Sequence, residues 1–241
     1  MEIIQTPNYD VMSQRACDLL IETVQQSERP VLGLATGSTP EGLYKQLIEQ
    51  YESGKVTFKQ ATTFNLDEYV GLTADDPNSY RYYMDNKLFH HIDLPDDRAF
   101  LPKGDASNPE QECRTYETMI QNAGQVDLQV LGLGLNGHIG FNEPGTPFDS
   151  RTHVVELDET TRQANARFFA SIDDVPTRAI TMGINTIMES KKIVLLVSGE
   201  KKADAVKQLV NGEVTEEFPA SILQKHENVV LIGDEEALSK L

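Results

Sequence analysis

The sequence predicts one α/β domain built on an open, mostly parallel sheet with helices on both faces. Short apolar runs alternate with longer helical patterns along the chain, as in successive strand–helix–strand units. The later apolar runs are aliphatic or β-branched at nearly every position, which is typical of strands buried on both faces. No internal repeat or Pro/Gly/Ser-rich linker divides the 241 residues, so residues 1–241 are expected to form a single domain.

Six strands are expected, most of which end in glycine or a polar turn: 30–36, 61–66, 126–133, 178–182, 193–197 and 229–232. The helical patterns between them are Asp10–Gln26, Glu41–Glu52, Ser79–His91, Pro109–Asn122, Thr160–Phe169 and Lys201–Asn211. Sheets of this kind bind ligands at the carboxyl ends of their strands, near the point where the strand order reverses. A binding site is therefore expected in the loops that follow Thr36, Leu66, Leu133 and Val197.

The composition excludes several classes of partner. Lys and Arg number 21 against 38 Asp and Glu, a net charge of −17, whereas nucleic acids and anionic membranes require a basic surface. No apolar run approaches the roughly 18 residues of a membrane span, and the first residues lack a signal-peptide pattern. The two cysteines, Cys17 and Cys113, stand far apart and form no Cys-x-x-Cys pair, as in proteins of the reducing cytosol. We therefore expect a cytoplasmic protein with a small-molecule partner.

The first loop, Gly37-Ser38-Thr39, lies between an expected strand and an expected helix. Gly37 allows a ligand to approach the backbone closely, and free N–H groups at a helix N-terminus can hold a phosphate. Thr39 suits the N-cap of the helix and Pro40 its first position, so a plain, well-capped turn explains the same residues equally well. The loop is not a Walker A motif, because no Gly-Lys-Ser/Thr follows.

The second loop begins with two adjacent carboxylates, Asp67 and Glu68. Neighbouring side chains at a strand end face different directions, so at most one of them is expected to point into a cleft. Asp67 is a candidate general base for removing a proton next to a carbonyl group, a task for a partly desolvated carboxylate. A helix or turn cap on an acidic chain is the alternative.

The third loop is the strongest local feature of the sequence. Residues 132–140 contain four glycines and one imidazole, that of His138, with Asn136 and Glu143 on either side. One ring nitrogen could be held by these neighbours while the other meets a substrate, which indicates an acid–base relay. One histidine with one carboxylate offers too few ligands for a metal. A structural histidine remains the alternative, but the glycine content and the position at a strand end favour function.

Taken in order, these segments resemble the glucosamine-6-phosphate deaminase family. The resemblance rests on 34–40, 63–72 and 136–144, and on two later segments, 150–152 and 161–169, and so extends over nearly the whole chain. Each motif is weak by itself, whereas the ordered set is highly specific. The resemblance implies a Rossmann-like fold and the conversion of glucosamine 6-phosphate and water to fructose 6-phosphate and ammonia.

The resemblance also implies roles for individual residues. His138, oriented by Glu143 and Asn136, would move the proton that opens the sugar ring, and Asp67 would transfer a proton from C2 to C1. The phosphate would be held by five residues: Gly37, Ser38, Thr39, Arg167 and Lys202. The resemblance implies no cofactor and no metal, and a monomer or small homo-oligomer is expected.

One residue departs from the family pattern, and two other functions compete. Many family members carry aspartate where this chain has Asn136, which can hydrogen-bond His138 but supplies no charge; Glu143 is therefore expected to stabilise the imidazolium.

A 6-phosphogluconolactonase shares the fold and a Gly-His loop, but typically has Asp-Glu-Arg where this chain has Asp-Glu-Tyr at 67–69. A sugar-phosphate-sensing module would require an attached helix-turn-helix, for which the residues before Pro30 leave little room.

Overall fold

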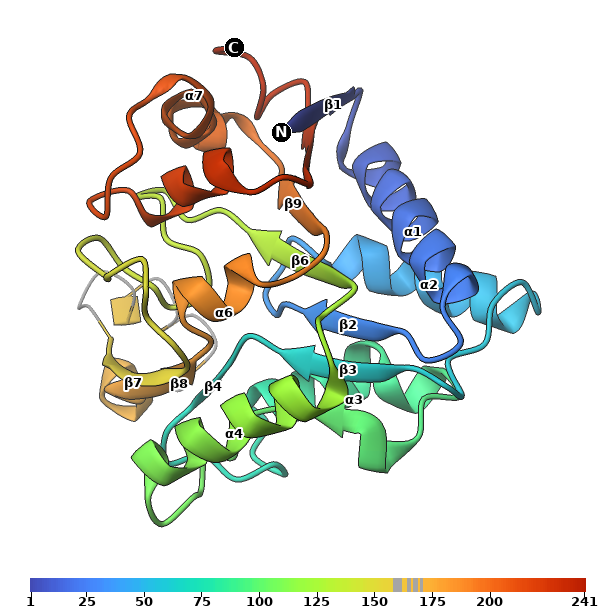
Figure 1. Cartoon of the computed structure of the whole chain (residues 1–241), viewed down its shortest axis with the longest axis vertical. Helices are drawn as coiled ribbons and strands as arrows, with labels where there is room; N and C mark the ends of the chain where they lie inside the picture. The colour runs from blue at the N-terminus through green and yellow to red at the C-terminus, as the bar shows by residue number, and fades with distance from the viewer. Residues whose placement is uncertain (158–161, 164–165, 167–168, 170) are drawn as a thin grey trace.

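The main sheet runs through the middle of the protein and has only parallel strands (Figure 1). The computed structural model describes residues 1–157, 162–163, 166, 169 and 171–241. Within these residues the order is β1 (Glu2–Thr6), β10 (Val229–Asp234), β9 (Ile193–Val197), β6 (Leu128–Gly132), β2 (Val31–Leu34), β3 (Thr62–Asn65) and β5 (Ala99–Phe100). The predicted parallel α/β sheet is confirmed, and β1 and β5 are strands that the sequence pattern did not reveal.

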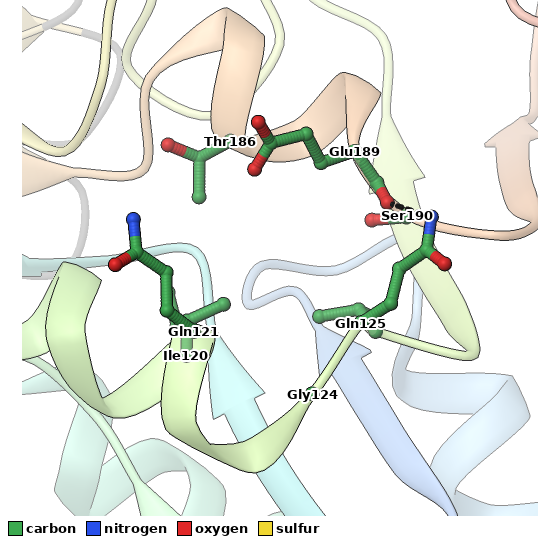
Figure 2. A pocket seen from close by; sticks show the side chains of 8 residues that line it. Ile120, Gln121, Gly124, Gln125, Thr186, Glu189 and Ser190 are labelled. Carbon is green, nitrogen blue, oxygen red and sulfur yellow. Dashed lines mark hydrogen bonds between the residues drawn. The ribbon is translucent and has the colours of Figure 1, made fainter.

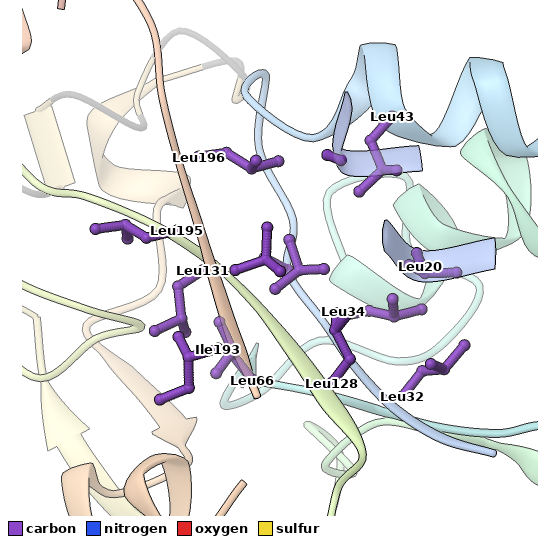
Figure 3. Packing of buried hydrophobic residues seen from close by; sticks show 14 of the residues in the cluster. Leu20, Leu32, Leu34, Leu43, Leu66, Leu128, Leu131, Ile193, Leu195 and Leu196 are labelled. Atoms are coloured by element: carbon purple, nitrogen blue, oxygen red, sulfur yellow. The ribbon is translucent and has the colours of Figure 1, made fainter. Parts of the chain in front are cut away.

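Both faces of this sheet are buried, which explains the continuous apolar strands. Every residue of β2 and β9 is buried. On one face, leucines of β2 such as Leu32 and Leu34 pack towards Leu20 of α1 (Tyr9–Gln26) and Leu43 of α2 (Glu41–Glu52) (Figure 3). On the opposite face the side chain of Phe64 contacts the ring of Tyr116 on α4 (Pro109–Ala123), as expected because neighbouring strand residues alternate between faces.

The helices follow the predicted pattern with shifted ends. Those described are α1 and α2, α3 (Tyr80–Lys87), α4 (Pro109–Ala123), α6 (Ile184–Met188) and α7 (Ala203–Asn211), of which α6 was not predicted. The predicted helix Ser79–His91 ends at Lys87 and continues as a 3-10 turn, and the predicted helix at Lys201 begins with a 3-10 turn before Ala203. The predicted helix Thr160–Phe169 lies mostly outside the described residues.

A second, smaller sheet corrects one prediction. The apolar run 178–182 was expected in the main parallel sheet, but β8 (Arg178–Thr181) lies between β4 (Asp67–Tyr69) and β7 (His153–Glu156) and is antiparallel to both. A short apolar run looks the same in either kind of buried sheet, so its pattern does not reveal its partner. The small sheet pairs Asp67 with Thr181 directly beyond the end of β3.

The strand order reverses next to β2. From β2 the chain adds β3 and β5 on one side, whereas β6, β9 and β10 are added on the other side. The carboxyl ends of β2 and β6 therefore form the crevice in which ligands of such sheets bind. None of the described helices is long and apolar enough to span a membrane.

Candidate active site

Four loops meet at the carboxyl end of the main sheet. They follow β9, β6, β2 and β3, which are consecutive neighbours in the sheet. The loops after these same four strands are the ones predicted to hold the site, and the adjacency of the strands brings residues that are far apart in the chain to one edge of the sheet.

The loop after β2 bends at Gly37, whose φ of +95° lies in the left-handed region that favours glycine. It leads into α2, which begins at Glu41. The structure corrects the predicted cap, because Pro40 and not Thr39 occupies the N-cap position and makes no side-chain cap bond. In the described part of the chain, the backbone N–H groups of Ser38 and Thr39 donate to no other residue.

Asp67 lies at the start of β4 with only 7% of its surface exposed. Burial and, to a lesser extent, the neighbouring Glu68 raise the pKa of its carboxyl group to about 8. A buried carboxylate with few hydrogen-bond donors is a stronger proton acceptor than one in water, as a general base requires.

Glu68 points away from this position, in agreement with the expectation for adjacent carboxylates. Its side chain accepts hydrogen bonds from the backbone N–H groups of Tyr80 (3.0 Å) and Arg81 (2.9 Å) at the start of α3, and from that of Tyr69 (2.9 Å). Burial raises the pKa of Glu68 to about 7, although these three bonds oppose the shift. Glu68 therefore fixes α3 to β4 and holds the neighbouring Asp67 in place.

The loop after β6 forms a chain of three polar side chains. The amide nitrogen Nδ2 of Asn136 donates to Oε2 of Glu143 at 2.7 Å, and its oxygen Oδ1 lies 2.7 Å from Nδ1 of His138. Because the carboxylate can only accept, the amide oxygen faces the ring, and Nδ1 of His138 carries the proton. The other ring nitrogen, Nε2, then has a free electron pair. Oε2 of Glu143 also lies 3.6 Å from Nδ1.

Glycines shape this loop around the imidazole. A Cβ atom at Gly134 would lie 2.3 Å from Nδ1 of His138, so only glycine permits the ring to rest on the backbone there. The same loop is fixed to the small sheet, because the N–H of Phe141 donates to Oγ1 of Thr181 at 3.1 Å. Asn142, which is buried, also donates to the carbonyl group of Met182 at 2.8 Å.

Asp67 meets the histidine loop at Gly140. This glycine has a φ of +57°, and a Cβ atom there would lie 2.9 Å from Oγ1 of Thr181 and 3.7 Å from Oδ2 of Asp67. The small sheet therefore places the candidate base next to the backbone of the loop that carries the candidate relay. Thr181 and Gly140 were not among the predicted site residues, because their proximity to Asp67 depends on a strand pairing across more than 100 residues.

Lys202 reaches the site from the end of β9. Its Nζ donates to the carbonyl oxygen of Leu133, at the beginning of the histidine loop, at 2.5 Å. Burial lowers the pKa of this amine. Arg167, the second predicted cation, lies outside the described residues. Among the described residues there is no group of three or more His, Cys, Asp or Glu side chains that could hold a metal.

A cavity of about 320 Å³ lies elsewhere, beside the amino ends of β6 and β9 (Figure 2). Gln121, Gln125 and Thr186 are among the residues that line it, as is Glu189, which pairs with Arg151 at 2.5 Å. It is separate from the four loops and is not part of the candidate site.

Comparisons with known proteins agree on one family. The family model described as "Glucosamine-6-phosphate isomerases/6-phosphogluconolactonase" matches residues 7–232. A glucosamine-6-phosphate deaminase of Oceanobacillus iheyensis is 59% identical over 241 residues, which cover all of this chain and 96% of that protein. Glucosamine-6-phosphate deaminase 1 of Bacillus subtilis is 52% identical over 239 residues, with 99% of each chain covered.

Solved structures give the same result for the fold. A monomeric glucosamine-6-phosphate deaminase superposes over the full length of both chains with a TM-score of 0.98 and 52% identity. The 6-phosphogluconolactonase of Trypanosoma brucei shares the fold at 21% identity and a TM-score of 0.80, covering all of this chain and 98% of that one. The chain therefore belongs to the family of glucosamine-6-phosphate isomerases and 6-phosphogluconolactonases.

Proposed function

We propose that this protein is a glucosamine-6-phosphate deaminase, an enzyme that converts glucosamine 6-phosphate and water to fructose 6-phosphate and ammonia. Full-length relatives at 52–59% identity carry this name. The observation that carries the proposal is the position of the buried Asp67 carboxylate beside Gly140 of the histidine loop, where an added Cβ atom would lie 3.7 Å from Oδ2. Removal of a proton from C2 needs a base beside the group that opens the ring, whereas lactone hydrolysis needs no base at C2.

Ring opening is assigned to His138. With the proton of the neutral ring on Nδ1, Nε2 can accept the hydroxyl proton at C1 and return a proton to the ring oxygen as the C1–O5 bond breaks. The imidazolium formed in between is stabilised by Glu143, whose carboxylate lies 3.6 Å from Nδ1. Asn136 contributes no charge, and its role is to hold the ring in the required tautomer.

Asp67 performs the next step on the open chain. Its carboxylate removes the C2 proton and returns it to C1, while O1 gains a proton and the nitrogen at C2 loses one, so that the aldehyde and amine become an alcohol and a C2 imine by way of an enol-type intermediate. Water adds to the imine and ammonia leaves, which gives the C2 ketone of fructose 6-phosphate. The pKa of Asp67, raised by burial, suits a group that must take up a proton and release it again.

The phosphate group is assigned to a small region of positive potential in a chain whose net charge is −17. The backbone of Gly37, Ser38 and Thr39 supplies N–H groups, and Lys202 supplies a positive charge from the adjacent strand end. Arg167 is proposed as a second cation on the family resemblance. We propose that the reaction needs no cofactor, since proton transfers and hydrolysis account for every step.

The organisation of the enzyme is also proposed. Residues 1–241 would act as one domain in the cytoplasm, where the buried thiols of Cys17 and Cys113 remain reduced. The full-length structural relative is described as monomeric, and a monomer or small homo-oligomer is proposed here.

Ammonia release from glucosamine 6-phosphate tests this function directly. The purified protein is expected to release one ammonia for each fructose 6-phosphate formed, and to leave 6-phosphogluconolactone at its spontaneous rate of hydrolysis. Hydrolysis of the lactone without ammonia release from the amino sugar would assign the protein to the lactonases. Binding without turnover of either compound would favour the sensing module.

Gly140→Ala should reduce kcat/KM by about 10- to 100-fold, since small displacements of catalytic groups have effects of this size. The added methyl group would collide with Thr181 at 2.9 Å and displace the loop next to Asp67. Gly145→Ala is the matched control, because Gly145 also has a positive φ (+88°) but no atom lies within 4 Å of the added methyl. Equal losses in both variants would mean that backbone strain, and not crowding of the site, causes the effect.

Lys202→Ala should raise KM for glucosamine 6-phosphate about tenfold or more, with a smaller change in kcat, because a charged hydrogen bond to the phosphate is lost. Lys201→Ala removes an exposed neighbouring charge and should change neither constant. Steady-state kinetics at constant ionic strength measure both. An unchanged KM in the Lys202 variant would exclude a phosphate contact at this residue.

A further inference from the structure

Two tyrosines bind the carbonyl groups of the loop after β2. The hydroxyl of Tyr9, the first residue of α1, lies 3.0 Å from the carbonyl oxygens of both Ser38 and Thr39. The hydroxyl of Tyr83, on α3, donates to the carbonyl oxygen of Gly37 at 2.6 Å. Three consecutive carbonyl groups of one short loop thus lie within hydrogen-bond distance of hydroxyls from two different helices, and the carbonyl groups of Ser38 and Thr39 share the single proton of Tyr9.

These bonds determine where the loop N–H groups point. In a trans peptide the N–H of one residue is antiparallel to the carbonyl group of the residue before it, and the described chain has no cis peptide. The bond from Tyr83 to Gly37 therefore turns the N–H of Ser38 away from the phenol, and the bond from Tyr9 to Ser38 does the same for Thr39. Both N–H groups are left without an acceptor among the described residues.

Tyr9 also replaces the missing cap of α2. Pro40 offers no side-chain acceptor at the N-cap position, and the N–H of Gly42 donates to the hydroxyl of Tyr9 at 2.8 Å. Gly42 permits this approach, because a Cβ atom there would lie 2.8 Å from Cε1 of the tyrosine ring. One N–H of the first helical turn is thereby satisfied within the protein, and that of Glu41 is satisfied by the carbonyl group of Ser38, whereas the N–H groups of Ser38 and Thr39 keep no acceptor among the described residues.

We propose that Tyr9 and Tyr83 are positioning residues that preorganise the Ser38 and Thr39 N–H groups for the phosphate of the substrate. The proposal rests on the proposed function, since it assigns the phosphate to this loop. Neither phenol touches the phosphate, because each binds the carbonyl side of the loop. Because the two tyrosines already fix the loop in the free protein, the loop loses less conformational entropy when the phosphate binds.

Tyr9→Phe, Tyr83→Phe and the double variant test the proposal. Tyr83→Phe should raise KM for glucosamine 6-phosphate about three- to tenfold, the effect of one lost hydrogen bond. Tyr9→Phe, which also loses the bond from the N–H of Gly42, should raise KM at least as much, and the double variant should raise it further. The inhibition constant of inorganic phosphate should rise by the same factor, while kcat changes less than twofold. Tyr82→Phe and Tyr51→Phe are the controls, because their hydroxyls make no hydrogen bond among the described residues.

A purely structural role would give a different pattern. It would lower the melting temperature and the fraction of active enzyme, and therefore the apparent kcat. KM and the phosphate inhibition constant would stay at the wild-type values. That pattern would overturn the proposal. Calorimetric titration of wild-type and variant protein with inorganic phosphate separates this failure from failure of the proposed function. If the wild type releases no ammonia, weaker phosphate binding by the tyrosine variants still supports the positioning role, and equal binding refutes it.

Discussion

Asp67→Asn should lower kcat for ammonia release about 10³-fold and leave KM within about twofold of the wild type. The amide keeps the size and shape of the side chain but cannot accept the C2 proton, and general bases contribute effects of this size. Exchange of the C2 proton with deuterium from solvent, followed by NMR, measures the step itself. Exchange should be abolished together with ammonia release.

Asp75→Asn is the matched control, because Asp75 is exposed and lies outside the site. Its kinetic constants and its exchange rate should equal those of the wild type. If the Asp67 variant still exchanges the C2 proton at the wild-type rate, another group is the base. If it loses substrate binding to the same extent as turnover, Asp67 acts in binding.

The same substitution should stabilise the protein in a pH-dependent manner. The pKa of Asp67 is raised from 3.8 to about 8 in the folded state, so ionisation of this carboxyl group lowers the free energy of unfolding as the pH rises between these values. Asp67→Asn has no ionisable carboxyl group at this position, so its free energy of unfolding does not fall in this way. Its melting temperature should therefore exceed that of the wild type by an amount that grows from pH 5 to pH 8 and then levels off.

His138→Gln should lower kcat for glucosamine 6-phosphate about 10²-fold. Glutamine can retain a hydrogen bond to Asn136, but it cannot take up and release the proton that opens the ring. The loss should be much smaller for a substrate analogue that cannot close its ring, because that analogue bypasses the step. His90→Gln, at an exposed position in the 3-10 turn after α3, should leave both rates unchanged. Equal losses with the cyclic and the open substrate would remove the ring-opening role from His138.

Several features of the site follow from local sequence patterns. Buried apolar runs and intervening amphipathic segments predicted the parallel sheet, and the general rule for such sheets selected four loops that follow neighbouring strands. The grouping of Asn136, His138 and Glu143 could also be predicted, because these residues lie within one glycine-rich loop of eight positions. Local spacing is sufficient where the contacts themselves are local.

Other features required long-range contacts. The run 178–182 has the composition of a strand of the main sheet, yet it pairs with β4, and only that pairing brings Thr181 and Gly140 to Asp67. Thr39 has the residue type of a helix cap, but the hydroxyl of Tyr9 receives the N–H of Gly42 instead. The sequence pattern contained no signal for Tyr9, because an isolated tyrosine on an amphipathic helix does not indicate its partner.

The sequence by itself determined the α/β class, the chain-order alternation of strands and helices, and the residues available for acid–base chemistry. These depend on hydrophobic periodicity and turn chemistry, which act over a few neighbouring residues. The tertiary structure decided which carboxylate of the pair Asp67 and Glu68 faces the histidine loop, and which way the peptide groups of 37–39 point. Both depend on hydrogen bonds between groups far apart in the chain, whose geometry exists only after the sheets and helices have packed.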